Sequence, residues 1–435
     1  MRLETSTRPP RSALVRAFIA ALSGTSLEWY DFAAYSVASA LVFGDLFFPS
    51  EDPLSGTLLA FSTYAVGYLS RPLGGFVFGR LGDVLGRKQV LVSTLLLTGA
   101  ATVLIGLLPT HGQVGSLGGV LLVVLRFAQG VGIGGEWGGA VLLSSEFGSA
   151  ERRGFWASAA QIGPPAGNLL ANGVLAVLSA LLTAEQFLSW GWRVAFLLSA
   201  VLVVFGLWIR VRLEETPVFR QLQEQGEQAS APLREVFRSE PRALVSAVLA
   251  RVGPDVLYAL FTVFVLTYAT QRLGLPKSWA VAGVMSGSAV QLALIPAAGW
   301  LSDRWGRRRV YAVGAVGGGV WPFVFFPLIG GGSAALLVAG TALGLVWHSL
   351  MYGPQAAFVA EQFSPRLRYT GCSLAYTLAG VLGGALAPLL FTSLFAFFDS
   401  WVAPACYLLG TCAVTLVGLA LSPRAARAGS RRGAR

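Results

Sequence analysis

Two carboxylates in an otherwise apolar run are the residues of this chain best suited to proton chemistry. Glu28 and Asp31 lie in the sequence LEWYDF, inside the apolar stretch between Phe18 and Phe43. Residues three apart share one face of a helix, and a bilayer core is crossed by about 20 apolar residues. A charge at the bilayer centre costs roughly 2.5–3.5 kcal/mol, so such residues face a protein interior or a cavity. The pair therefore predicts an interior proton site in a membrane-spanning protein.

The composition of the whole chain is typical of a membrane protein. Of 435 residues, 54% are hydrophobic and 12% are charged, whereas soluble domains carry about 25% charged residues. The net charge of +11 comes from Lys and Arg in short loops and tails, which is the positive-inside pattern and not a nucleic-acid surface. The three cysteines lie in apolar runs without metal-ligand spacing. We expect no cofactor, no metal and no nucleic-acid partner.

The apolar runs predict an all-α protein with twelve membrane-spanning helices. The Lys and Arg residues of alternate loops place both termini in the cytoplasm, in a multi-pass protein of the plasma (inner) membrane. We expect a monomer. The predicted spans are about 17–43, 55–79, 90–109, 117–143, 155–182, 192–211, 243–271, 278–300, 309–329, 333–358, 369–397 and 400–421.

A repeated loop motif divides these spans into two halves. The pattern of Gly79, Asp83 and Gly86 recurs as Gly299, Asp303 and Gly306, about half the chain further on. Parallel six-helix repeats are a known transporter architecture. The predicted domains are a disordered N-terminus at 1–12, a first six-helix bundle at 13–211, a cytoplasmic linker at 212–242, a second bundle at 243–421 and a basic tail at 422–435.

The repeated loops are expected to act as conformational gates. Glycine permits the tight turn, and each aspartate can interact with the N-terminus of a neighbouring helix. The basic residues can bridge carboxylates and hold the cytoplasmic side shut, or they serve only to orient the protein. The gating candidates are Gly79, Asp83, Gly86, Arg87, Lys88, Glu146, Gly299, Asp303, Arg304, Gly306, Arg307, Arg308 and Glu361.

Arg126 is the expected partner of the proton site. At 1.5 Å per residue, Arg126 and Asp31 both fall near the centre of their spans, so we expect an ion pair between them. Protonation of Asp31 or Glu28 would then release Arg126 to a new partner, unless the pair is a static salt bridge. Glu136, nearer the cytoplasm, is either a proton exit site or, as we prefer, a structural partner of Arg71.

Substrate-binding candidates gather around the seventh span. Arg251 and Asp255 are four residues apart beside Pro254, and helices broken by Gly or Pro often bind substrate in transporters. The planar guanidinium suits a carboxylate, although a self-neutralising pair is the alternative. His348 is expected to be a hydrogen-bonded packing residue. The further substrate candidates are Arg126, Tyr258, Trp29, Tyr30 and Gln161.

The stretch GVGIGG at 130–135 matches a dinucleotide-binding pattern but lies in a predicted membrane helix. That pattern signifies nucleotide binding only after a strand, and small residues in membrane helices permit close packing. We therefore interpret it as a packing motif.

Several motifs together resemble the major facilitator superfamily, and more narrowly its metabolite:H⁺ symporter branch. They are LEWYDF, RPLGG at 71–75, RFAQGVGIGGEWGGA at 126–140, QIGPPAGNLLANG at 161–173 and AEQFSPRLRYTG at 360–371. GGEWGGAVLL and the 161–173 stretch look most like shikimate-type transporters, while proline/betaine, α-ketoglutarate and citrate transporters share the plan.

The resemblance implies secondary active, proton-coupled uptake by alternating access. Arg126 and Arg251 favour a small organic acid or zwitterionic metabolite as the substrate, and we expect no enzymatic activity because no nucleophile–base pair or metal cluster stands out. A same-fold exporter or uniporter and a transporter-like membrane sensor stay open as alternatives.

One position departs from the family pattern: the basic residue expected after Asp83 is Val84, whereas the second loop keeps Arg304. We expect a weaker first gate there, or one that depends more on Arg80 and Arg87.

Overall fold

The computed structural model describes residues 11–49, 63, 66–227, 229 and 232–423. Within these residues the chain is almost entirely helical and has no strand. Among the described residues, ten helical segments are long and apolar enough to cross a membrane. The predicted spans at 17–43 and 55–79 are not among these ten. The predicted tails at 1–10 and 424–435 and most of the early part of the second predicted span lie outside the described residues.

The first half of the chain supplies the elements that carry most of the interior charges. Its helices are α1 Arg11–Ala38, α2 Gly44–Phe47, α4 Arg71–Val84, α5 Arg87–Leu107, α6 His111–Val114, α7 Leu117–Phe147, α8 Arg153–Ala157, α9 Gly163–Leu181, α10 Ala184–Gln186 and α11 Trp192–Val211. The second half continues with α14 Pro241–Ala259, α15 Val265–Gln271, α16 Lys277–Trp305, α17 Arg307–Ile329, α18 Ala334–Ala360, α19 Arg368–Ala379, α20 Ala387–Phe398 and α21 Val402–Leu421.

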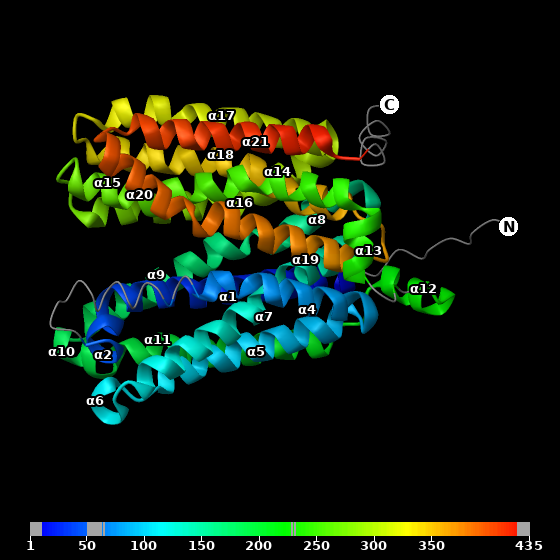
Figure 1. Ribbon diagram of the computed structural model, residues 1–435, viewed down its shortest axis with the longest axis horizontal. Helices are drawn as coiled ribbons and strands as arrows, with labels where there is room; N and C mark the ends of the chain where they lie inside the picture. Colours follow the sequence, from blue (N-terminus) through cyan, green and yellow to red (C-terminus); the bar gives the residue numbers. More distant parts are fainter. Residues whose placement is uncertain (1–10, 50–62, 64–65, 228, 230–231, 424–435) are drawn as a thin grey trace.

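These helices form two bundles that lie side by side (Figure 1). Within the first bundle α1 packs on α9 and α5 packs on α7, and within the second α16 packs on α18 and α14 on α21. The bundles meet through two sets of contacts: α19 lies against α4 and α7, while α8 and α9 lie against α16. The two sets use equivalent helices of the two halves, which fits a repeated architecture.

The predicted span at 155–182 is interrupted. The chain forms α8, then a 3₁₀ turn at Ser158–Gln161, and then α9. Pro164 and Pro165 follow in the first turn of α9; proline is tolerated there because it lacks the N–H donor that a helix interior requires. Gln161 therefore lies at a break in the helix, beside the interface between the bundles.

The molecule is apolar on its outer surface and charged in its interior. Exposed side chains include Val204, 67% accessible, and Leu389, 65% accessible, while Arg126 and Asp31 are buried. A soluble protein would leave no such apolar belt in water, but hydrocarbon lipid covers it without cost. The buried charges are stabilised instead by ion pairs and hydrogen bonds inside the protein.

Two short helices occupy the segment between the bundles: α12 Pro217–Gln225 and α13 Pro232–Ser239. Both lie at one end of the molecule (Figure 1). α13 contacts α4 of the first half and α14 and α19 of the second, and its Glu235 accepts a hydrogen bond from Arg366 at 2.8 Å. The segment is therefore attached to both halves, while the predicted domain boundaries stay a prediction.

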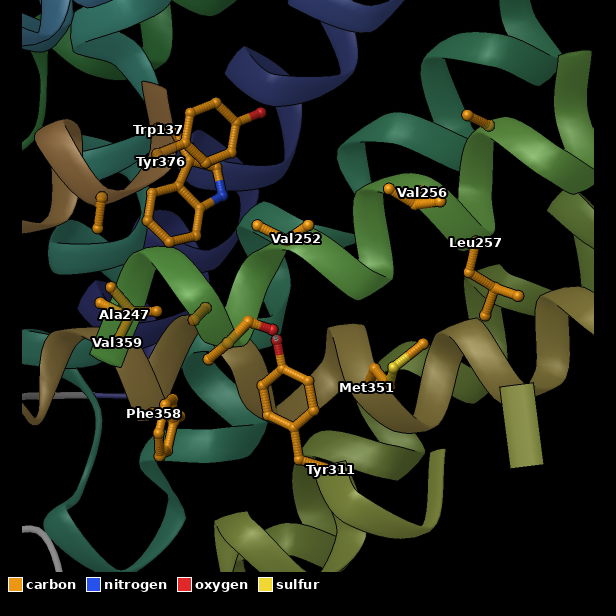
Figure 2. Close-up of a cluster of buried hydrophobic side chains, with 14 of the residues drawn as sticks. Trp137, Ala247, Val252, Val256, Leu257, Tyr311, Met351, Phe358, Val359 and Tyr376 are labelled. Carbon is orange, nitrogen blue, oxygen red and sulfur yellow. Dashed lines mark hydrogen bonds between the residues drawn. The ribbon is translucent and has the colours of Figure 1, made fainter. Parts of the chain in front are cut away.

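The largest hydrophobic cluster crosses the interface between the bundles. Figure 2 shows the rings of Trp137 from α7 and Tyr376 from α19 overlapping at one end of this cluster. The two ring centroids are 4.5 Å apart and the planes differ by 21°. Stacked aromatic pairs contribute about 0.5–1.5 kcal/mol beyond their buried area, so this pair stabilises contact between the halves.

Candidate functional site

Asp31 lies at one end of a chain of hydrogen-bonded side chains inside the first bundle. The Thr102 hydroxyl donates to its Oδ2 at 2.6 Å, Gln129 Nε2 donates to Thr102 Oγ1 at 2.7 Å, and Arg126 donates to Gln129 Oε1. Asp31 and Arg126 are both described and form no direct ion pair, so the expected pair is wrong in its geometry. Asp31 and Arg126 lie at similar depths along their spans, but the hydroxyl of Thr102 and the amide of Gln129 lie between the two charges.

Arg126 also lies against aromatic rings of α1. Its guanidinium carbon is 3.9 Å from the centre of the Tyr35 ring and 4.4 Å from that of Phe32. Contacts of this kind stabilise a buried cation by roughly 2 kcal/mol when it is desolvated. Arg126 is thus held on the first bundle, and its role as a substrate ligand stays a prediction.

Glu136 pairs with an arginine that the sequence analysis did not single out. Arg210 of α11 forms a two-pronged ion pair with Glu136, and Thr94 donates to Glu136 Oε2 at 2.9 Å. The expected partner Arg71 instead has its Nη2 4.0 Å from Glu28 Oε1. The prediction of an Arg71–Glu136 pair is therefore wrong. Arg210 is the second-to-last residue of α11 and follows a long apolar run, and that position was the available signal.

A second group of charges lies between the bundles; we call Glu28, Arg71, Arg251, Asp255 and Tyr376 the central cluster. Arg251 Nε donates to Asp255 Oδ2 at 3.1 Å, and its guanidinium carbon is 3.5 Å from the centre of the Tyr376 ring. Glu28 of the first half is close enough to interact electrostatically with Arg71, Arg251 and Tyr376. Charges from both halves thus converge at one place.

Of the aromatic residues predicted to bind substrate, Trp29 and Tyr258 lie near the central cluster and Tyr30 does not. Trp29 contacts Tyr258 edge-to-face with centroids 5.8 Å apart, and Tyr258 lies 5.2 Å from the His348 ring. His348 is hydrogen-bonded to Gln291 at 2.8 Å, in agreement with its expected packing role. Tyr30 instead donates its hydroxyl to the Ala195 carbonyl at 2.7 Å, inside the first bundle, so the structure does not bring it to this group.

Gln161 lies in a network that joins the halves on the cytoplasmic side of the central cluster. Trp137 Nε1 donates to Gln161 Oε1 at 2.7 Å, and Gln161 Nε2 donates to Gln355 Oε1 at 2.9 Å. Gln355 in turn donates to the Tyr311 hydroxyl at 3.1 Å. With the Trp137–Tyr376 stack, this network closes the interface below the cluster. Gln355 and Tyr376 were missed because an amide and a phenol in apolar runs carry no distinctive sequence signal.

Each loop aspartate caps a helix of the opposite half. Asp83 accepts hydrogen bonds from the backbone N–H groups of Tyr369 and Thr370 at 3.2 and 2.9 Å, at the start of α19. Asp303 accepts from Gly154 and Phe155 at 2.8 and 2.9 Å, at the start of α8. We call these two contacts the inner lock. They satisfy N–H groups that a helix start leaves without intrahelical partners.

Some basic residues of the two loops pair with the loop carboxylates, and others form hydrogen bonds elsewhere. Arg87 lies 3.7 Å from both Asp83 and Glu146, and Arg307 pairs with Asp303 at 2.5 Å and Glu361 at 2.9 Å. Lys88 and Arg308 do not bridge these carboxylates: Lys88 donates to the Val211 carbonyl at 2.8 Å, and Arg308 donates to Ser422. The expectation that basic loop residues bridge carboxylates is thus confirmed for Arg87 and Arg307 and wrong for Lys88 and Arg308 among the described residues.

The glycines of the loop motif have two different roles. Gly86 and Gly306 adopt φ of 115° and 94°, a region that L side chains rarely enter. Gly299 instead allows a close approach, since a Cβ there would lie 2.6 Å from the Gly154 carbonyl oxygen of the other half. The motif therefore combines a turn with a point of close contact between the halves.

The position of Val84 in the first loop corresponds to that of Arg304 in the second loop. Arg304 is exposed and lies over the Trp300 ring at 4.0 Å, away from the helix cap that Asp303 makes. In the first loop Arg87 lies near both Asp83 and Glu146, and the effect of Val84 on the strength of this gate stays a prediction.

We expect neutralisation of Asp303 to open the cytoplasmic side. In Asp303→Asn one oxygen can no longer accept a backbone N–H and the ion pair with Arg307 is lost, and hydrogen bonds to charged groups contribute about 1.5–3 kcal/mol each. The closed-to-open ratio should fall at least about tenfold. Spin labels at exposed Arg152 and Trp305, in a background without cysteines, would report the change as a longer distance distribution.

The matched control is Glu214→Gln, which removes a charge from an exposed ion pair with Arg220 in the linker. It should leave the distances unchanged. A distribution for Asp303→Asn identical to that of the control would show that the inner lock does not hold the halves together.

Two bundles of membrane-length helices that meet around buried charges and are locked at one end define a membrane transporter. The Major Facilitator Superfamily model matches residues 17–388, and the chain belongs to this superfamily. It is a transporter of the inner membrane and not an enzyme.

Curated relatives agree over nearly the whole chain. The shikimate transporter of Escherichia coli (strain K12) is 39% identical, covering 97% of this chain and 99% of its own. The inner membrane metabolite transport protein YhjE of the same organism is 40% identical over 87% of each chain. The proline/betaine transporter of that organism is 32% identical, covering 93% of this chain and 82% of its own.

Solved structures show the same fold at low sequence identity. The proton:xylose symporter XylE bound to 6-bromo-6-deoxy-D-glucose superposes with a TM-score of 0.74 at 18% identity, covering 94% of this chain and 95% of its own. The predicted fold class, an all-α membrane protein of the major facilitator type with two helical bundles, is thereby confirmed.

Proposed function

We propose that this protein is a proton-coupled symporter that takes up a small carboxylated or zwitterionic metabolite by alternating access. The observation that carries the proposal is the central cluster, in which Arg71 of one half and Arg251 of the other lie with carboxylates at the same level of the molecule. A substrate carboxylate bound there contacts both halves, so its binding depends on their relative position. No cofactor is needed, because the proton gradient supplies the driving force, and a monomer contains the whole site.

Arg251 is the side chain best placed to receive the substrate carboxylate. Its Nη1 is buried and has no hydrogen-bond partner among the described residues, and neither has the Tyr376 hydroxyl. An unsatisfied buried donor costs about 1–3 kcal/mol, and a carboxylate oxygen would remove that cost for both groups. The two relatives named for shikimate and for proline/betaine carry compounds that each contain a carboxylate, which supports this substrate class.

The coupling step follows from the interior acids of the first half. Asp31 and Glu28 are buried, and burial disfavours a charged carboxylate whereas a nearby cation favours it. Movement of the halves changes both effects, so proton affinity depends on conformation. In this scheme the proton and substrate together release the inner lock, and their departure on the cytoplasmic side allows the lock to form again.

Uptake into proteoliposomes tests the proposal. A panel of shikimate, α-ketoglutarate, citrate, proline and betaine would be offered with an imposed inward proton gradient, with an equal-pH sample as control. We expect accumulation of at least one carboxylate compound that disappears when the gradient is collapsed. Equilibration of the substrate that does not depend on the proton gradient would indicate a uniporter. Accumulation driven by an outward proton gradient would indicate an exporter. Substrate binding without transport would indicate a sensor.

The Arg251→Gln variant should lose substrate affinity. Removal of a charge-assisted, planar contact costs about 1.5–3 kcal/mol, so KM should rise by roughly tenfold to a hundredfold. Arg251→Lys keeps the positive charge but lacks the planar guanidinium, so its KM should lie between those of the wild type and Arg251→Gln. Initial rates of exchange in proteoliposomes measure KM without a need for proton coupling.

Arg272→Gln is the matched control, because Arg272 is 52% exposed and pairs with Asp399 at the molecular surface. It should leave KM unchanged. A KM for Arg251→Gln within about twofold of the control, well below one tenfold step of affinity, would exclude Arg251 as the substrate anchor.

A further inference from the structure

A buried amide of the second bundle lies close to the central cluster. Gln291 of α16 and His348 of α18 are both buried, and Gln291 Nε2 lies 2.8 Å from His348 Nδ1. The rings of His348 and Tyr352 are 4.7 Å apart, and Tyr352 is close enough to Arg251 to interact with it electrostatically. The amide is therefore two side chains away from the proposed carboxylate site.

The contacts of Gln291 determine which end of its amide is free. Nε2 also lies 3.4 Å from the Leu345 carbonyl oxygen, which can only accept a hydrogen bond, so the nitrogen end of the amide faces Leu345 and His348. Oε1 then has no hydrogen-bond partner among the described residues. His348 and Leu345 thus hold an acceptor in place, and its partner must bring a donor.

Ser288 provides a second polar group on the same face of α16. It lies three residues before Gln291, which places both on one side of the helix. Serine in a helix can donate back to a carbonyl of the preceding turn, as Ser302 of α16 does to Gly299 at 2.6 Å. Ser288 is fully buried, and its hydroxyl has no such bond and no other partner among the described residues. It is available both to donate and to accept.

The separation of Arg251 from this polar pair matches the length of one small molecule. Tyr258 lies seven residues beyond Arg251 in α14, about 10 Å further from the cytoplasmic linker at 1.5 Å per residue. The Tyr258 ring is 5.2 Å from that of His348, which holds Gln291. A molecule whose carboxylate binds Arg251 therefore extends outward to the level of the amide.

The aromatic residues at this level are packed against other rings and do not form a cage for a cation. Trp29 meets Tyr258 edge-to-face, with ring planes 77° apart, and Tyr258 also contacts His348. The nearby Asp255 is already paired with Arg251 at 3.1 Å. An uncharged acceptor and a hydroxyl, with no free carboxylate, suit the hydroxyl groups of a ligand better than a quaternary ammonium.

We propose that Gln291 and Ser288 bind hydroxyl groups of the substrate, so that the transported metabolite is a hydroxylated carboxylic acid. One substrate hydroxyl donates to Gln291 Oε1, and Ser288 donates to or accepts from another. A site that hydrogen-bonds a substrate hydroxyl rejects an analogue without it, because the polar groups of the site are then left unpaired. The inference rests on the proposed function and names the substrate class of the same site.

Matched pairs of acids with and without hydroxyl groups test this proposal. The pairs are shikimate with cyclohexenecarboxylate, quinate with cyclohexanecarboxylate, and gluconate with hexanoate, and titration calorimetry of the purified protein in detergent measures each Kd. At least one hydroxylated acid should bind at least about tenfold more tightly than its partner, the factor that one buried hydrogen bond supplies. Gln291→Leu should bring this ratio close to one, whereas Arg251→Gln should weaken both members and keep the ratio.

Ser288→Ala is an independent test should Gln291→Leu disturb packing, because it removes only one hydroxyl group. It should lower the ratio severalfold, while Ser286→Ala, at an exposed position of the same helix, should leave it unchanged. Equal affinities within all three pairs, or a ratio that survives both Gln291→Leu and Ser288→Ala, would overturn the proposal. Uptake of proline or betaine without binding of any hydroxylated acid would overturn it and leave symport intact. Absence of binding and uptake for every carboxylate would instead contradict the proposed function.

Discussion

Asp31→Asn is expected to lose proton-driven accumulation while retaining substrate exchange. The amide keeps the shape of the side chain and can still accept the hydrogen bond from Thr102, but it cannot bind or release a proton. Exchange requires only movement of the loaded carrier, so it does not depend on this step. Loss of a proton-transfer group typically costs about 10²–10⁴-fold in rate, and we expect coupled uptake to fall by about a hundredfold or more.

Paired assays on the same proteoliposomes measure both quantities: accumulation under an imposed pH gradient, and counterflow of labelled substrate at equal pH. Asp399→Asn is the matched control, since Asp399 is an exposed residue with φ of 46°, a conformation that asparagine also adopts. It should behave as the wild type. Gradient-driven accumulation by Asp31→Asn at the control level would exclude Asp31 as the coupling site.

Gly134→Ala is expected to destabilise the fold strongly. Gly134 of α7 faces the backbone of α4, and a Cβ there would lie 2.0 Å from the Arg71 carbonyl oxygen. Gly74 of α4 makes the reciprocal approach, with a Cβ position 1.9 Å from the Val131 carbonyl oxygen. Backbone cannot move aside as a side chain can, so the two helices must separate. Overpacking typically costs 1–3 kcal/mol, and we expect at least about 3 kcal/mol here.

Thermal unfolding of the purified protein in detergent measures this effect. The control is Gly173→Ala in α9, where an added Cβ meets no atom within 4 Å; alanine there should be neutral or stabilise the helix by up to about 1 kcal/mol. Equal melting temperatures for the two variants would contradict the packing argument. The same contact explains the glycines at Gly74 of RPLGG and Gly134 of GVGIGG, in agreement with the interpretation of GVGIGG as a packing motif.

Much of this protein followed from local sequence properties. The length and polarity of the apolar runs predict the spans, because hydrocarbon tolerates only helices whose backbone is internally satisfied. The repeat of Asp83 and Asp303 predicted helix-terminal contacts, which the inner lock contains. Arg251 and Asp255, four residues apart on one helix, were also recognisable as a pair, because their spacing alone brings them together.

Pairings between different helices depended on the tertiary structure. Depth along a span can be counted from the sequence, but rotation about the helix axis and the identity of the neighbouring helix cannot. Arg126 therefore reaches Asp31 only through Gln129 and Thr102, and Glu136 pairs with Arg210 instead of Arg71. For the same reason the partners of the two acids in LEWYDF could not be read from the sequence: Glu28 lies 4.0 Å from Arg71 of α4, whereas Asp31 accepts a hydrogen bond from Thr102 of α5.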